Sequence, residues 1–291
     1  MDKSQRKIDL LAGAGNHDKL SLDAGDRILV FDSGLGGLTV LSELQKLPLD
    51  VQYIYAADSA AFPYGGMPAE DLQKRVCRVM EHLLETFRPK LAVVACNTVS
   101  TLTMPQLRQI FSIPFIATVP AVKPAALLSQ TGYFTVLATP GTISRQYTKE
   151  LISAYAGRCQ VNLVGSPNLA VLAEKKMQGE KVSDDEILAE ILPCFIEVGA
   201  LRTDVIAMAC THYPLLLEEF KRLAPWPVKW IDPAPAIANH LFDIVEQKDN
   251  TRNVADKHFA VFTSADGPAQ YMKNALPQWL LDDVLIEQVS S

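Results

Sequence analysis

The sequence predicts an α/β protein made of two pseudo-symmetric domains, each built on a parallel sheet, with an active site in the cleft between them. Short apolar, β-rich runs alternate with amphipathic helical patterns, which is typical of βαβ units. Several runs are continuously apolar, as strands covered on both faces are. The order of motifs in the first half also recurs in the second. Cys96 ends an apolar run 64 residues after Asp32, and Cys210 follows Thr139 by 71 residues.

Nine apolar runs have the length and composition of strands. These runs are Arg27–Phe31, Val51–Ala56, Leu91–Ala95, Pro114–Val119, Tyr133–Ala138, Gln160–Val164, Asp204–Ala209, Val228–Ile231 and His258–Thr263.

The clearest helix is predicted between Pro68 and Phe87, where apolar residues recur every three or four positions. Pro68 suits the first helical position, where its missing N–H would have no partner in any case. Ser183 and Glu186 have the spacing of a capping box, which predicts the start of a second long helix.

The predicted division of the chain has three parts. Residues 1–26 are polar and mixed in charge, which indicates a flexible extension. Residues 27–121 and 231–291 are expected to form the first domain, and residues 122–230 the second. The tail is assigned to the first domain because its additional strand and helix would otherwise remain unpacked.

The composition is that of a globular protein with a substantial core, at 291 residues, 48% hydrophobic and 21% charged. The net charge of −6 and the lack of a basic tract argue against nucleic acid as a partner. No apolar run approaches the roughly 18 residues of a membrane span. Five cysteines, an odd number without regular spacing, fit a reducing, cytoplasmic location.

The segment Asp32-Ser33-Gly34-Leu35-Gly36-Gly37 lies between a predicted strand and a predicted helix. Its glycines permit a tight turn, and the helix N-terminus behind them can bind an anion such as a carboxylate. Thr39 stands where a dinucleotide fingerprint needs glycine, and no Gly-Lys-Ser/Thr of a P-loop follows. An ordinary turn explains this motif equally well, although the acid at the strand end favours a binding loop.

A plain turn is also the simpler interpretation of the segment Phe62-Pro63-Tyr64-Gly65-Gly66. The hydroxyl of its Tyr64 could reach a ligand.

Cys96 and Cys210 support each other as functional residues. A single cysteine at a strand end is usually a small buried hydrophobe. Two at equivalent positions of a repeat suggest one thiol on each side of a bound molecule. A thiol with a pKa of about 8.5 needs about 2 kcal/mol of local stabilisation to reach a pKa near 7. His212, turn amides and a helix N-terminus could supply it.

Two other readings of the cysteines are open. Cys210 and His212 could be half of a zinc site, but no second ligand pair has suitable spacing, so no metal is predicted. A thiol redox protein is disfavoured because no Cys-x-x-Cys occurs.

Four motifs resemble the glutamate racemases, in the same order along most of the chain. They are Asp32-Ser33-Gly34-x-Gly36-Gly37, Pro63-Tyr64-Gly65, Ala95-Cys96-Asn97-Thr98 and Ala209-Cys210-Thr211-His212-Tyr213-Pro214. The resemblance implies cofactor-independent interconversion of L- and D-glutamate, which supplies D-glutamate for peptidoglycan. It also implies two pseudo-symmetric α/β lobes with glutamate between them.

The resemblance also implies roles for single residues. Cys96 and Cys210 match the two catalytic acid/base residues, with Cys96 acting on D-glutamate and Cys210 on L-glutamate. Glu174 matches an acid that orients the histidine, although Ser166-Pro167-Asn168 departs from the more typical Cys-Pro-Leu ahead of it. The residues that match substrate contacts are Asp32, Ser33, Tyr64, Gly65, Asn97, Thr98, Thr139, Thr142, Thr211 and His212.

The N-terminal extension and the run Val119-Pro120-Ala121-Val122-Lys123-Pro124 resemble a Gram-negative subgroup. That resemblance implies activation by the peptidoglycan precursor UDP-N-acetylmuramoyl-L-alanine. The sequence leaves open whether the chain is a monomer or a homodimer. Two alternative functions are also open. The protein could be a racemase for aspartate or another acidic amino acid, or a non-catalytic binding protein on the same scaffold.

Overall fold

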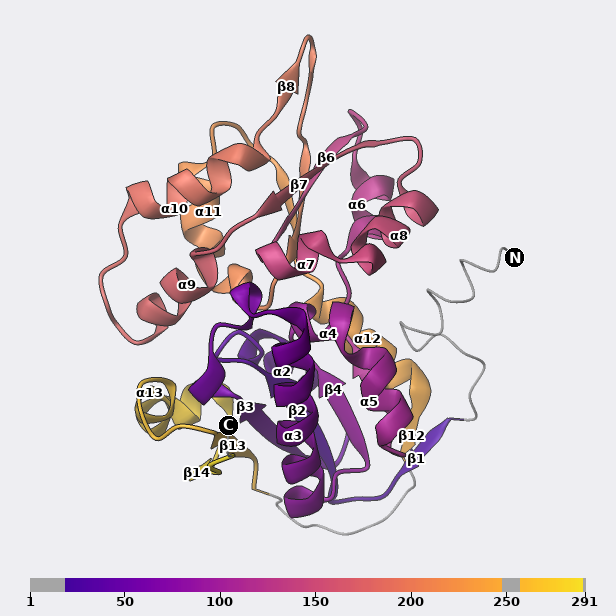
Figure 1. The fold of residues 1–291 in the computed structure, drawn as a ribbon, viewed down its shortest axis with the longest axis vertical. Coiled ribbons are helices and arrows are strands. Elements are labelled where there is room, and N and C mark those ends of the chain that lie inside the picture. Colours follow the sequence, from indigo (N-terminus) through magenta and orange to yellow (C-terminus); the bar gives the residue numbers. More distant parts are fainter. Residues whose placement is uncertain (1–18, 248–256, 290–291) are drawn as a thin grey trace.

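The computed structural model describes residues 19–247 and 257–289, which form two lobes that each contain a parallel sheet (Figure 1). The first lobe, in the lower half of Figure 1, holds a six-stranded sheet of order β14-β13-β3-β2-β4-β5. Its strands are β2 Asp26–Asp32, β3 Val51–Ala57, β4 Leu91–Val94, β5 Phe115–Ala117, β13 Phe259–Phe262 and β14 Asp283–Ile286. The second lobe holds a four-stranded sheet of order β11-β10-β6-β7. Its strands are β6 Tyr133–Ala138, β7 Gln160–Gly165, β10 Val205–Ala209 and β11 Lys229–Ile231.

The internal repeat is visible in the strand order. The first four strands of the first lobe lie in the order β3-β2-β4-β5, and the four of the second lobe lie in the order β7-β6-β10-β11. In both sheets, the strands that lie side by side are the second, first, third and fourth of these four along the chain. In such a sheet the connections leave in opposite directions on either side of the first strand. The carboxyl ends of the first and third strands there form a crevice in which ligands bind.

Both sheets are covered on two faces, which explains the continuously apolar strands. In β2, Ile28 and Val30 pack into one apolar cluster while Leu29 and Phe31 pack into another on the opposite face. In β10, Val205 and Ala207 lie on one side and Ile206 and Met208 on the other. This alternation is the period of two that an extended chain imposes.

Helices supply the second half of each core. In the first lobe they are α2 Leu38–Leu44, α3 Ala69–Phe87, α4 Asn97–Leu102, α5 Met104–Ile110, α12 Ala234–Ile244 and α13 Pro268–Ala275. In the second lobe they are α6 Val122–Leu128, α7 Pro140–Ser144, α8 Gln146–Tyr155, α9 Leu169–Met177, α10 Asp184–Ile191 and α11 Leu217–Leu223. Short 3-10 turns are η1 Ser59–Ala61, η2 Tyr64–Gly66, η3 Leu192–Cys194, η4 Tyr213–Leu216 and η5 Leu276–Trp279. The capping box predicted at Ser183 and Glu186 begins α10.

The C-terminal part of the chain returns to the first lobe, as expected from its unpaired strand and helix. β13 pairs in parallel with β3, and β14 adds to β13 at the edge of the sheet. Residues of α12 join the apolar cluster that α2 covers. These contacts support the predicted division of the chain, whose boundaries at 121/122 and 230/231 stay a prediction.

The structure differs from the sequence reading in four places. Helix α3 begins at Ala69, one residue later than predicted, and Pro68 precedes it in an extended conformation because its ψ is 142°. Residues Leu20–Leu22 of the predicted flexible extension form β1, which pairs with β12 Val245–Gln247, and residues 1–18 of that extension lie outside the described part. The hairpin of β8 Glu197–Val198 and β9 Leu201–Arg202 was not predicted because its strands have two residues each. The edge strand β14 was not predicted because its apolar run is only three residues long.

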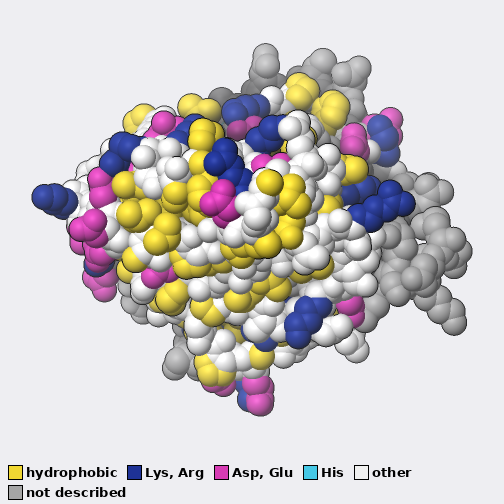
Figure 2. All heavy atoms as spheres, turned by 90° about the horizontal axis from the view of Figure 1, so that it is seen from above, with side chains coloured by type: hydrophobic (Ala, Val, Ile, Leu, Met, Phe, Trp, Pro, Cys, Tyr) yellow, Lys and Arg dark blue, Asp and Glu magenta, His cyan; other side chains and the backbone are white. Residues whose placement is uncertain are grey.

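Acidic and basic side chains lie close together on the face seen from the second lobe (Figure 2). The described helices include none that is both long and apolar enough to cross a membrane.

Candidate active site

The two candidate cysteines occupy equivalent positions at the facing ends of the two sheets. Cys96 follows β4 and precedes α4, and Cys210 follows β10, so each lies after the third strand of its lobe. Their side chains are 5% and 6% exposed. Both border one small cavity between the lobes. The structure therefore brings together the two thiols that the sequence repeat predicted to flank a ligand.

The cavity is lined by residues of both lobes. Its lining residues are Ser33, Phe62, Pro63, Tyr64, Gly65, Cys96, Asn97, Thr98, Thr139, Ala170, Cys210, Thr211 and His212. Three of the predicted site residues, Asp32, Thr142 and Glu174, are not among these lining residues.

In all, ten of the thirteen predicted site residues reach the cavity, and the other three contact residues that do. Three lining residues, Phe62, Pro63 and Ala170, were not among the predicted site residues. The ring of Phe62 lies 5.3 Å from that of His212, centre to centre. The only sequence signal for Phe62 is its position directly before the Pro63-Tyr64-Gly65 motif.

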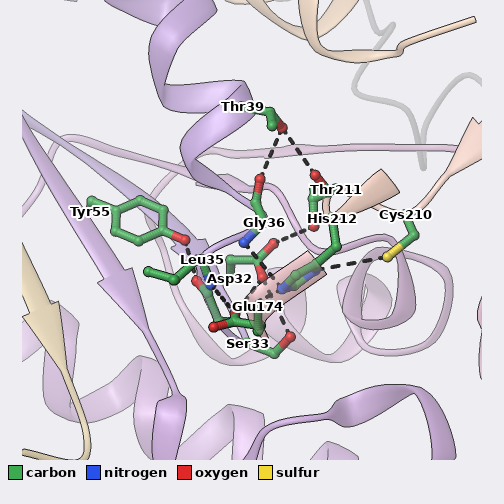
Figure 3. Close-up of polar contacts among 11 residues, drawn as sticks. Asp32, Ser33, Leu35, Gly36, Thr39, Tyr55, Glu174, Cys210, Thr211 and His212 are labelled. Carbon is green, nitrogen blue, oxygen red and sulfur yellow. Dashed lines mark hydrogen bonds and ion pairs between the residues drawn. The ribbon is translucent and has the colours of Figure 1, made fainter. Parts of the chain in front are cut away.

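On the Cys210 side, a chain of polar contacts leads from the thiol to Glu174 of α9 (Figure 3). Cys210 Sγ lies 3.9 Å from His212 Nδ1, and His212 Nε2 lies 3.0 Å from Glu174 Oε1. The Gly36 N–H also points at Nε2, at 3.2 Å. Nε2 either donates to Glu174 or accepts from Gly36. We favour donation, because a carboxylate that is 4% exposed gains more from a donor than an amide gains from a second acceptor.

These contacts favour a charged His212. Burial lowers the pKa of His212, but the bonds to Cys210 and Glu174 and their negative charges outweigh it, so the pKa lies well above 6.5. His212 as an imidazolium places a positive charge 3.9 Å from the Cys210 sulfur. The predicted role of Glu174, which is to orient the histidine, has this geometry in its favour.

Cys96 lies in a different electrostatic environment. Burial raises the pKa of its thiol, and the nearby carboxylate of Asp32 raises it further. The backbone N–H groups of Val99 and Thr98, at the start of α4, oppose this effect only in part. Without a ligand, Cys96 therefore holds its proton.

Asp32 connects the two lobes behind the cavity. Thr211 Oγ1 of the second lobe donates to Asp32 Oδ2 at 2.9 Å, and the Gly34 N–H donates to Asp32 Oδ1 at 3.0 Å (Figure 3). Burial raises the pKa of Asp32, while the charge of His212 and these two bonds lower it. Asp32 thus fixes the glycine turn against Thr211.

Small polar side chains line the opposite wall. The hydroxyls of Thr98 and Thr139 lie 3.0 Å apart, and those of Thr139 and Thr142 also lie 3.0 Å apart. Thr139 caps α7 by accepting from the Thr142 N–H. The amide oxygen and nitrogen of Asn97 are buried and have no protein partner. Since buried polar groups normally have partners, the Asn97 amide is available to a polar ligand.

Tyr64 differs from the sequence expectation in one respect. Its hydroxyl donates to Asp58, away from the cavity, so it is already engaged. Tyr64 still borders the cavity, together with its neighbours Pro63 and Gly65.

The described residues contain no group of three or more His, Cys, Asp or Glu side chains arranged to hold a metal ion. The remaining cysteines, Cys77, Cys159 and Cys194, do not line the cavity. The arrangement as a whole fits an enzyme that removes and returns protons on opposite faces of a small carbon acid, which is the chemistry of a racemase or epimerase.

Comparison with known proteins identifies the family. A sequence model of the Asp/Glu/Hydantoin racemase family matches residues 40–241. The chain is 50% identical over 238 residues to the glutamate racemase of Agrobacterium fabrum, covering 81% of this chain and 87% of that protein. It is 50% identical over 241 residues to the glutamate racemase of Bartonella quintana, covering 81% and 88%. The chain therefore belongs to the Asp/Glu/Hydantoin racemase family.

Solved structures agree with this assignment. The structure of Escherichia coli glutamate racemase in complex with L-glutamate and the activator UDP-MurNAc-Ala is similar, with a TM-score of 0.83 and 36% identity. The match covers 92% of this chain and 100% of that chain. The glutamate racemase isoform RacE1 of Bacillus anthracis matches with a TM-score of 0.73 and 28% identity over 92% of this chain and 98% of that chain.

Proposed function

We propose that this protein interconverts L- and D-glutamate, with Cys96 and Cys210 exchanging the α-proton from opposite faces. The observation that carries the proposal is that two thiols, at equivalent strand ends of a repeated fold, border one cavity. Its relatives, which are glutamate racemases at about half identity, support glutamate as the substrate. We expect the D-glutamate to enter peptidoglycan synthesis in the cytoplasm.

In the reaction from L-glutamate, Cys210 acts as the base, with His212 Nδ1 3.9 Å from its sulfur. Cys210 takes the α-proton, and the electron pair of the C–H bond moves into the α-carboxylate to give an enediolate. Cys96, which holds its proton in the free enzyme, then protonates the opposite face. The reverse reaction exchanges the two roles. Each positioned acid or base typically accelerates a reaction by about 10²–10⁴, and the two thiols carry out these steps without a cofactor or metal.

Substrate binding is assigned to the polar wall and the two glycine-containing turns. The unpartnered amide of Asn97 and the hydroxyls of Ser33, Thr98 and Thr139 are suited to carboxylate and ammonium groups. Developing charge on the enediolate is stabilised best by donors that are already in place. Thr142, Asp32 and Glu174 hold these groups from behind.

Hydrogen exchange at the α-carbon tests the proposal. The protein is incubated with L-glutamate in deuterated water without added pyridoxal phosphate or metal. D-glutamate should appear and carry deuterium at the α-carbon. Loss of activity with a strong chelator, restored by zinc, would contradict the mechanism. The same assay with L-aspartate distinguishes a racemase for the shorter acid.

The roles of the thiols are separated with a glutamate analogue that has a leaving group on the β-carbon. After α-proton removal, this analogue expels the leaving group, so it needs only one base. Cys96→Ala should lose elimination of the D-analogue and retain the L-analogue, and Cys210→Ala should show the opposite preference. Cys159→Ala is the matched control and should process both. If both variants lose elimination of the same analogue enantiomer, the thiols do not flank the substrate.

A second ligand site is proposed on the other side of the lobe junction. A cavity of about 550 Å³ lies between α6, α8 and α12, and it is lined by five residues of the Val119–Pro124 run that resembles activated racemases. Lys123 at its border lies 5.4 Å from the ring centre of Tyr155. We propose that UDP-N-acetylmuramoyl-L-alanine, the activator named for the Escherichia coli relative, binds in this cavity and places its diphosphate near Lys123.

Turnover of L-glutamate with and without this nucleotide tests the second site. The nucleotide should increase turnover, and Lys123→Ala should require a higher nucleotide concentration while its basal rate stays unchanged. Lys149→Ala, which removes an exposed lysine of α8 outside the cavity, is the control. Equal rates with and without the nucleotide over a wide concentration range would exclude activation.

A further inference from the structure

Behind the loop of residues 62–66, which lines the active site, lies a buried ion pair that the proposed chemistry does not use. Asp58, at the end of β3, is fully buried, and Arg75 of α3 is 8% exposed. Arg75 Nε donates to Asp58 Oδ2 at 2.9 Å, and Arg75 Nη2 donates to Asp58 Oδ1 at 2.7 Å. Such a two-pronged pair fixes the direction of both side chains as well as their separation.

Asp58 accepts two further bonds, one on each oxygen. The Tyr64 hydroxyl donates to Oδ2, and Thr263 Oγ1, just after β13, donates to Oδ1 at 2.7 Å. Thr263 Oγ1 in turn accepts from the Ala60 N–H of η1 at 3.0 Å. The carboxylate therefore joins the active-site loop, α3 and the C-terminal part of the sheet. All four of its bonds come from side chains that are at least nine-tenths buried.

The loop that Asp58 holds contacts both halves of the active site. Tyr64 packs in the same apolar cluster as Cys96. Phe62 packs against the ring of His212. Gly65 lies against Thr139 so closely that a Cβ would come within 2.9 Å of the threonine Cβ. A small displacement of this loop would change the cavity wall on the Cys96 side and the His212 side together.

We infer that Asp58, Arg75 and Thr263 are positioning residues that hold the 62–66 loop in the shape that binds glutamate. None of the three lines the cavity. The inference rests on the proposed glutamate racemisation. It assigns the Tyr64 hydroxyl to anchorage of the loop and not to substrate contact.

The anchor also reaches the C-terminal segment. Arg75 Nη1 donates to the Val289 carbonyl at 2.9 Å, and His82 Nε2, also on α3, lies 2.9 Å from Glu287 Oε2. Residues near the end of the described chain thus contact the same helix that fixes Asp58. Arg75 thereby contacts both the C-terminal segment and, through Asp58, the active-site loop.

Thr263→Val tests the inference with a side chain of similar shape, because removing a buried charge could unfold the protein. This change removes both the bond to the Asp58 carboxylate and the acceptor for the Ala60 N–H. It should raise the KM for both glutamate enantiomers by about tenfold while kcat stays within about twofold. Thr263→Ser keeps the hydroxyl and should restore the wild-type KM. Ser183→Ala, which removes the cap of α10 far from this loop, controls for a general loss of stability.

Tyr64→Phe removes the second of the two hydroxyls that donate to Asp58 and completes a double-mutant cycle. If both hydroxyls act through the same anchor, the KM effect of the double variant should be smaller than the product of the two single effects. An unchanged KM for a folded Thr263→Val protein, or an equal rise for Ser183→Ala, would overturn the inference. A wild-type protein without racemase activity would instead overturn the proposed function, so the two failures are distinguishable.

Discussion

At the scale of single residues, the site depends on groups that meet only when the two lobes come together. The repeat made Cys96 and Cys210 predictable, because each ends an apolar run and both halves show the same order. The bond from the Leu35 N–H to Glu174 Oε1 was not predictable, since it joins residues 139 positions apart on different lobes. Phe62 was missed for a related reason: an aromatic ring in a turn has no chemical signature until its neighbour, His212, is known.

Gly36 provides a residue-scale prediction. A Cβ at this position would overlap the His212 ring and lie 2.6 Å from Thr211 Oγ1, both of which belong to the other lobe. Gly36→Ala should therefore hold the lobes apart and displace His212, and should lower kcat/KM by about 10²-fold. Steady-state kinetics in both directions measures the effect. Gly66→Ala is the control, because a Cβ there meets nothing within 4 Å, and its kinetics should match the wild type. Wild-type kinetics for Gly36→Ala would contradict the closed arrangement.

The charge state of His212 predicts a pH dependence of stability. Its pKa is raised well above the 6.5 of an unfolded chain, so the folded state binds a proton more tightly. That contribution is fully present below pH 6.5 and is lost as the pH rises through the folded pKa. The free energy of unfolding should fall above pH 6.5, by at most about 1.4 kcal/mol per pH unit, and should fall less steeply in His212→Gln.

Urea unfolding at several values between about pH 6.5 and 8.5 measures this slope. His240→Gln is the control above about pH 7.5, where an unfolded histidine is almost neutral. Burial lowers the pKa of His240 in the folded protein, so this side chain contributes little to the slope in that range. The slope of this variant should equal that of the wild type. Identical slopes for His212→Gln and the wild type would show that His212 is not charged in the folded protein.

At the scale of secondary structure, the apolar runs sufficed to locate the buried strands but not their order. All nine predicted strands are present, most with ends shifted by one or two residues. β1, β8, β9, β12 and β14 were missed because they are only two to four residues long, with at most three consecutive apolar residues in each. The shared order of the two sheets depends on contacts between distant segments. It therefore became visible only in the structure, although the spacing of the motifs indicated a repeat.

The end of α3 gives a prediction at this scale. Arg88 ends the helix in the left-handed region, with φ of 48°, where a side chain costs about 1 kcal/mol relative to glycine. Arg88→Gly should raise the free energy of unfolding by about that amount and leave kcat and KM unchanged. Arg88→Ala keeps the Cβ and removes the same charge, and should bring no such gain. Equal stabilities of the two variants would show that backbone strain at this position is negligible.

At the scale of the whole molecule, the structure shows a closed form. The space enclosed between the thiols is about 20 Å³, roughly the room for a single water molecule. Bonds across the lobes close it from several sides: Thr211 to Asp32, Glu174 to the Leu35 N–H, and Thr98 to Thr139. Glutamate, with ten heavy atoms, can enter only if these bonds break and the lobes separate. Sequence could predict the two lobes but not their closure, which depends on how their surfaces fit.

Hydrogen exchange distinguishes lobe opening from unfolding. The Leu35 N–H is bonded to Glu174 of the other lobe, so it exchanges when the lobes separate, whereas the N–H groups of Leu29 and Val30 lie within the buried sheet. Residues 33–37 should therefore exchange faster than residues 27–31, and D-glutamate should slow exchange in residues 33–37 only.

Thr39→Val removes the hydroxyl that lies 3.2 Å from the Thr211 carbonyl of the second lobe, and should speed exchange in residues 33–37 alone. Thr39→Ser keeps that hydroxyl and is the control. If both segments exchange at one rate in every variant, the cavity opens only by global unfolding, and a closed resting form could not admit its substrate.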